Sequence, residues 1–172
     1  MHPTANSVAL ISDTPCLLRR VRGGSIRALD AIAMNTNELV QKLDAEGFNP
    51  TYYCIGSGWR RLGDGHALDK VGNSYEWFYV ERGEKRHVEG VFTSEEEACQ
   101  FAYEALSSNK SAQSHMVGMF ETESEALDLV RRLSLAGIES ETDRIPYGGP
   151  DDPRFRVFVY GRDVFNVRHI VG

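Results

Sequence analysis

The sequence lacks a long apolar run. The longest one, residues 8–11, is closed by Asp13, and the arginines beside it follow the apolar residues, whereas a signal peptide carries its charge first. No stretch approaches the ~20 apolar residues that a membrane-spanning helix needs. We therefore expect a cytoplasmic protein with no membrane partner.

Cysteine is scarce, and the histidines lack metal-binding spacing. The three cysteines, Cys16, Cys54 and Cys99, are an odd number, far apart and without a CxxC pair, which argues against a disulfide framework or a zinc site. The five histidines form no HExxH or HxH motif. We expect a reducing compartment, no metal and no cofactor.

The glycine-rich segment 56–65 lacks the helix that a phosphate-binding loop requires directly behind it, because a β-rich segment follows instead. The segment does contain Trp59, Arg60 and Arg61, and both residue types are enriched at interface hot spots. We predict that these three residues contact a partner. The alternative is an ordinary loop whose tryptophan folds back on the core.

Nothing in the sequence specifies a catalytic centre. His66 lies near Asp64, but nucleophiles and bases are assembled in space, so this adjacency is uninformative. Cys54 and Cys99 lie in apolar elements, where cysteine is usually a buried structural residue. We expect a protein that is not an enzyme.

The sequence has fewer basic than acidic side chains. The net charge is −6, and residues 35–172 alone carry 15 basic and 23 acidic side chains, a net of −8. Such a field repels nucleic acid and anionic lipid and accelerates encounter with a basic protein. The alternative is that this charge serves solubility alone.

The chain divides into an irregular start and two patterned segments. Residues 1–34 hold Pro3, Pro15 and a glycine pair without periodicity, which predicts an irregular arm or an upstream start codon with the functional chain beginning at Met34. Residues 35–107 predict an α-βββ-α unit: a helix capped by Thr36 or Asn37, a β-rich segment, strands and a second helix. The β-rich segment is 51–55, the strands are 66–71, 74–81 and 85–92, and the second helix follows the capping box at Ser94.

A second unit begins after a polar linker. Residues 115–172 predict a β-α-β-β order, with a strand at 115–120 and a helix that places Ala126, Leu127, Val130 and Leu133 on the core. Segments 138–144, 154–160 and 164–171 are β-rich. The fold class is α+β, an antiparallel sheet with helices packed on one face, and the two units can form one compact domain.

The strand 74–81 is dense in aromatic residues on both faces, with Trp77 on one and Phe78 on the other, so at least one face should be covered by a helix. Acidic side chains follow the same hairpin. We predict that Glu76, Glu81 and Glu84 contact a partner, the alternative being a solvated surface.

Three runs, together with the helix 36–43 and its closing Gly47, resemble small bacterial immunity proteins encoded beside contact-dependent growth-inhibition or polymorphic toxins. The runs are Tyr52–Gly56, Trp77–Gly83 and Phe92–Cys99, and the resemblance covers about residues 36–107. It implies a cytoplasmic inhibitor that binds a cognate toxin domain and needs no catalytic residues. The acidic charge of residues 35–172 makes a basic toxin domain the expected partner.

The segment 115–160 departs from this pattern. It looks more like a β-α-β-β module of the ligand-binding regulatory or peptidoglycan-binding kind, although the latter acts outside the cytoplasm. Under this alternative the chain is a regulatory module that recognises a small molecule or a peptide.

Overall fold

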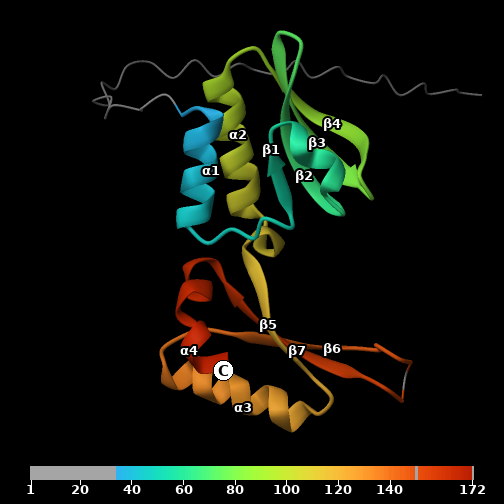
Figure 1. Ribbon diagram of the computed structural model, residues 1–172, viewed down its shortest axis with the longest axis vertical. Helices are drawn as coiled ribbons and strands as arrows, with labels where there is room; N and C mark the ends of the chain where they lie inside the picture. Colours follow the sequence, from blue (N-terminus) through green and yellow to red (C-terminus); the bar gives the residue numbers. More distant parts are fainter. Residues whose placement is uncertain (1–33, 150, 172) are drawn as a thin grey trace, which may run out of the picture. The chain divides into compact units, whose positions relative to one another are not determined.

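Two sheets and the helices beside them make up the part of the chain that the computed structural model describes, residues 34–149 and 151–171 (Figure 1). The expected arm at 1–34 lies outside these residues except for Met34. The first elements are α1 (Thr36–Ala45), β1 (Tyr53–Ile55), the 3-10 helix η1 (Ser57–Arg61), β2 (Asp64–Val71), β3 (Ser74–Glu81), β4 (Glu84–Phe92) and α2 (Glu95–Ser108). Then follow η2 (Lys110–Gln113), β5 (Ser114–Phe120), α3 (Glu123–Leu135), β6 (Glu141–Ile145), β7 (Arg154–Tyr160), η3 (Gly161–Asn166) and α4 (Arg168–Val171).

The N-cap of helix α1 lies at least one residue earlier than predicted. Its cap is Asn35, not Thr36 or Asn37: the Asn35 side chain accepts hydrogen bonds from the backbone of Asn37 and Glu38, and the Glu38 carboxylate accepts one from the Asn35 backbone. Thr36 has another role, since its backbone and its hydroxyl both donate to Glu95 at the start of α2. The two helices are thereby joined at this end.

The first sheet has the order β1-β2-β3-β4. Strands β2, β3 and β4 form the predicted antiparallel meander, whereas β1 pairs with β2 in parallel. Helices α1 and α2 lie side by side along one face (Figure 1). The α+β class, the antiparallel pairing and the helix-covered face are confirmed, and the parallel edge strand was not predicted.

Strand β3 is buried on both faces at its centre. Trp77, 1% exposed, packs on the α1 and α2 side with Leu39, Leu43 and Leu68. Phe78, also 1% exposed, packs on the opposite side, where η1 and the residues after it supply the cover. The expectation that helices cover one aromatic face is correct, and a short loop covers part of the other.

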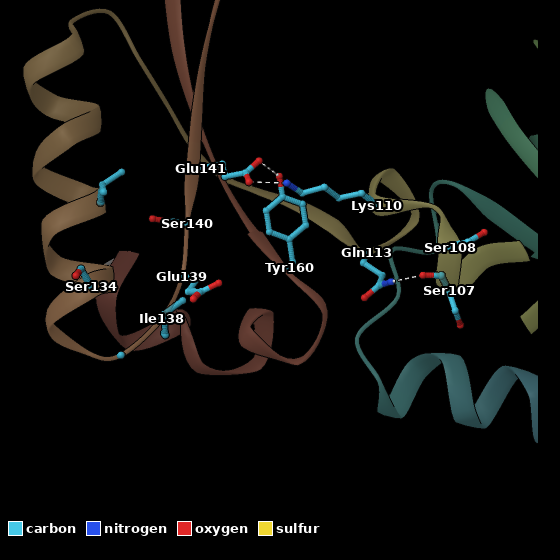
Figure 2. A pocket seen from close by; sticks show the side chains of 12 residues that line it. Ser107, Ser108, Lys110, Gln113, Ser134, Ile138, Glu139, Ser140, Glu141 and Tyr160 are labelled. Atoms are coloured by element: carbon cyan, nitrogen blue, oxygen red, sulfur yellow. Dashed lines mark hydrogen bonds and ion pairs between the residues drawn. The ribbon is translucent and has the colours of Figure 1, made fainter. Parts of the chain in front are cut away.

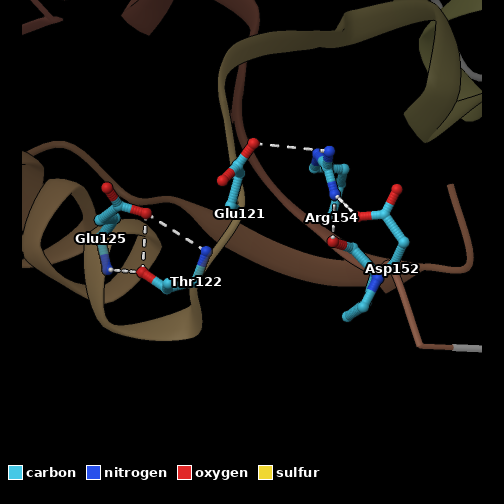
Figure 3. Close-up of polar contacts among 6 residues, drawn as sticks. Glu121, Thr122, Glu125, Asp152 and Arg154 are labelled. Atoms are coloured by element: carbon cyan, nitrogen blue, oxygen red, sulfur yellow. Dashed lines mark hydrogen bonds and ion pairs between the residues drawn. The ribbon is translucent and has the colours of Figure 1, made fainter. Parts of the chain in front are cut away.

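The second sheet has the order β5-β7-β6, antiparallel throughout, with α3 packed on one face. Thr122 and Glu125 form the predicted capping box at the start of α3 (Figure 3). Leu127 is 48% exposed, so its predicted core position is wrong. The buried stripe runs through Ala126, Leu129 and Leu133 at i, i+3 and i+7, which leaves position 127 about a third of a turn away from the centre of the stripe.

The predicted strand at 164–171 is also wrong, because this segment forms η3 and α4. Strand β7 already has a neighbour on each side, so the sheet offers no place beside it for the next segment. Gly161, at φ +54°, ends the strand. Val164, Val167 and Ile170 then recur every three residues and pack on the α3 core as helical turns.

Candidate functional site

The β3–β4 turn lies directly against the η1 segment. Arg82 and Gly83 take positive φ angles of 52° and 75°, as a two-residue hairpin turn requires. The Arg82 backbone donates to the Gly63 carbonyl at 2.5 Å. A Cβ atom at Gly83 would stand 2.6 Å from the Arg60 carbonyl oxygen, so the close approach requires glycine. The turn therefore brings the two predicted contact segments together.

Trp59 is fixed in place and half-buried. Its ring meets Phe78 edge-on at 5.3 Å between centroids, and its Nε1 donates to Asp69 at 3.0 Å. The Arg60 guanidinium lies 4.4 Å from the Trp59 ring centroid on the exposed side, and Arg61 is exposed. Trp59 thus folds back on the core, as the alternative held, and serves as a platform for an exposed arginine.

The predicted acidic residues are compensated by basic neighbours. Glu76 pairs with Lys85, whose ammonium lies over the Phe78 ring at 4.3 Å. The Arg86 guanidinium pairs with both Glu81 and Glu84: its Nε lies 2.8 Å from Oε2 of Glu81, and its Nη1 lies 3.0 Å from Oε2 of Glu84. Each of the three glutamates therefore has a basic partner. We call the six predicted contact residues the hairpin surface: Trp59, Arg60, Arg61, Glu76, Glu81 and Glu84.

A second cluster on this sheet was not predicted. The Nε2 atoms of His66 and His87 lie 3.2 and 3.1 Å from the same oxygen of Glu89, and Tyr79 lies between the two imidazoles. The pairing of His66 with Tyr79 and of Tyr79 with His87 across three strands creates the cluster. Strand alternation was the available signal, although a bulge near Glu89 obscures it. Within residues 34–149 and 151–171, no group of three histidine, cysteine or acidic side chains is arranged to hold a metal.

A pocket of about 810 Å³ lies around Tyr160, far along the sequence from the hairpin surface (Figure 2). Its volume is within the range of small-ligand sites. We call it the Tyr160 pocket; its lining comprises Ser107, Ser108, Lys110, Gln113, Val130, Ser134, Gly137, Ile138, Glu139, Ser140, Glu141 and Tyr160. Val130 and Ile138 are apolar, but most of the lining is polar, so the site is not the deep apolar pocket typical of many ligand modules.

Three side chains meet at the centre of this pocket (Figure 2). Glu141 accepts hydrogen bonds from the Lys110 ammonium on one oxygen and from the Tyr160 hydroxyl, at 2.7 Å, on the other. The bond to Glu141 raises the pKa of Lys110, and the bond from Lys110 lowers the pKa of Glu141. Desolvation, followed by the bond to Glu141, raises the pKa of Tyr160. At neutral pH the trio is an ion pair beside a neutral phenol.

The two described cysteines are not activated. Burial raises the pKa of Cys54, and it raises the pKa of Cys99 to about 11. Both are therefore protonated thiols at neutral pH, in contrast to the thiolate that a nucleophile or metal ligand requires. Cys16 lies outside the described residues.

Comparison with family models, with curated proteins and with solved structures found no match for this chain. Among the described helices, none is long and apolar enough to cross a membrane. Any function is therefore inferred from the geometry of the hairpin surface and of the Tyr160 pocket.

Proposed function

We propose that this chain is a cytoplasmic immunity protein that binds a cognate bacterial toxin domain and neutralises it without catalysis of its own. In this proposal the hairpin surface makes the contact, and occlusion of the toxin's active site or target surface produces the inhibition. The resemblance at residues 36–107 supplies the class of partner.

The observation that carries the proposal is the pre-organisation of the hairpin surface. Trp59 is held by Asp69 and Phe78, and it supports Arg60 at the edge of the turn. Tryptophan and arginine dominate interface hot spots, and side chains already held in place lose less conformational entropy when a partner binds. This region therefore combines the residue types and the rigidity of a binding anchor.

Charge has a separate role in the proposal. The hairpin surface carries little net charge: with Lys85 and Arg86 included, it has four basic side chains and three glutamates. The net of −8 over residues 35–172 acts at longer range and speeds encounter with a basic toxin domain. We expect the association rate to fall with added salt and the dissociation rate to depend on the hairpin contacts.

The proposal is tested by co-expressing the full chain with the polypeptide encoded immediately upstream of it. We expect a one-to-one complex at moderate salt and rescue of growth from the toxic domain. A double variant, Arg60→Ala with Arg61→Ala, is expected to weaken both. The matched control, Arg131→Ala with Arg168→Ala, removes the same charge at exposed positions in the second half. Absence of both complex and rescue in the native chain would overturn the proposal.

A further inference from the structure

Helices α2 and α3 both end at the Tyr160 pocket. Ser107 and Ser108 close the 14-residue helix α2, and Ser134 lies in the last turn of the 13-residue helix α3. The C-terminal end of a helix carries a partial negative charge, which favours a cation within about one turn of it. The backbone therefore makes the pocket attractive to positive groups before any side chain is considered.

The ionisable side chains strengthen this preference. Lys110 is the one basic residue of the lining, and its ammonium is already paired with Glu141. Glu139 lines the same pocket, is exposed, and has no hydrogen-bond or ion-pair partner among the described residues. In Figure 2 no dashed line reaches Glu139, whereas dashed lines join Glu141 to Lys110 and Tyr160. The pocket thus retains one uncompensated carboxylate.

The contacts of Lys110 show how an ammonium group is held in this pocket. Its ammonium lies 4.6 Å from the centroid of the Tyr160 ring while it donates to Glu141, so it has an aromatic face and a carboxylate at once. This pairing of groups is the usual setting of a bound ammonium or guanidinium. The pocket, at about 810 Å³, is much larger than one ammonium group, and its lining includes the apolar Val130 and Ile138, which an aliphatic stem can contact.

We propose that the Tyr160 pocket binds an alkylammonium or guanidinium group, with Glu139 as its principal carboxylate and Tyr160 as its aromatic contact. Two sources share this chemistry: a lysine or arginine side chain of the partner protein, or a free amine. Only the first source rests on the function proposed above. The binding chemistry itself does not depend on a toxin partner.

The first test titrates the full chain with Nα-acetyl-lysine methylamide and follows backbone amide shifts by NMR. Nα-acetyl-norleucine methylamide serves as the neutral probe of similar length. We expect saturable shifts at residues 137–141 and 160 with the lysine probe at millimolar concentration and much weaker ones with the neutral probe. Equal shifts with both probes, or none at these residues, would overturn the proposal.

Two variants separate this chemistry from a structural effect. Glu139→Gln is expected to weaken binding of the lysine probe about two- to fivefold, the range for an exposed charge pair. Lys110→Met is expected to strengthen it by a similar factor of about two to five, because it removes the resident cation and frees Glu141. Glu96→Gln is the matched control: Glu96 is exposed in the first turn of α2, at the opposite end of that helix. A change of equal size in that control, or weaker binding by Lys110→Met with its stability intact, would contradict the assignment.

The source of the cation is decided with the upstream-encoded partner. Weaker complex formation by Glu139→Gln would assign the pocket to a basic side chain of that partner. An unchanged complex, with the probe still bound, would assign it to a free amine. If the native chain forms no complex at all, the proposed function fails, and the amine titration still tests the pocket on its own.

Discussion

The two sheets of this protein differ in how many of their faces are buried. Strand β3 of the first sheet is buried on both sides at Trp77 and Phe78. The second sheet packs on α3 with one face only. On β5, Met116 and Met119 point away from this core and are 54% and 44% exposed; they lie opposite Phe158 and Arg156 of β7. The comparison indicates that the first sheet provides a rigid scaffold for the hairpin surface, whereas the second depends on a single core.

The largest expected effect is at the doubly covered strand. Trp77→Ala should lower the free energy of unfolding by about 3–5 kcal/mol, because it removes a large side chain from the main core and leaves a cavity. Met116→Ala on the open face of the second sheet should change it by less than about 0.5 kcal/mol. Urea unfolding of both variants measures the contrast, and equal losses would refute the difference between the two sheets.

The second prediction concerns the close approach of the turn to η1. Gly83→Ala should lower the free energy of unfolding by about 1–3 kcal/mol, because the added Cβ meets the Arg60 carbonyl and the residue must keep a positive φ. Gly72→Ala is the matched control at the other hairpin turn, with φ +61° and no atom within 4 Å of the added carbon. It should cost less, about 1 kcal/mol. If the two variants lost the same stability, the turn and η1 would not be in contact as described.

The third prediction is a pH dependence at the junction of α1 and α2. Hydrogen bonds from the Thr36 backbone and hydroxyl, with a further one from Tyr75, lower the pKa of Glu95 from 4.5. A carboxyl with a lowered folded-state pKa stabilises the fold above its unfolded pKa, and this contribution disappears as pH falls through the folded value. The stability difference between the native chain and Glu95→Gln should therefore be present at pH 7 and shrink below about pH 4.5. Urea titrations at pH 7 and pH 3 measure it, and a difference independent of pH would exclude the role of the Glu95 charge.

The first sheet was largely predictable because its signals are local. Glycine at positions 72 and 83 marks its two hairpin turns, and the alternation of Trp77 and Phe78 gives its two buried faces. The parallel pairing of β1 was not predictable, since it depends on how the chain returns after η1. The helical turns at 164–171 were missed because valine and isoleucine favour strands. Only the fold shows that β7 already has a neighbour on each side, which leaves no place for a further strand beside it.

The candidate sites follow the same division. The contact role of the hairpin residues was predicted from their types alone, and it stays a prediction. Their types did not show that Lys85 and Arg86 pair with the glutamates. The Tyr160 pocket joins segments near 107–113, 130–141 and 160, and no local pattern connects them. Sites assembled from distant segments require the fold before they can be recognised.

The central claim is that the hairpin surface binds a toxin domain, and isothermal titration of the full chain against the upstream-encoded toxic domain tests it most directly. We predict a one-to-one complex that Arg60→Ala weakens by at least about fivefold, the loss that corresponds to about 1 kcal/mol at a hot spot, while Arg131→Ala leaves the affinity unchanged. An undetectable interaction, or a tight complex equally indifferent to both substitutions, would contradict this account.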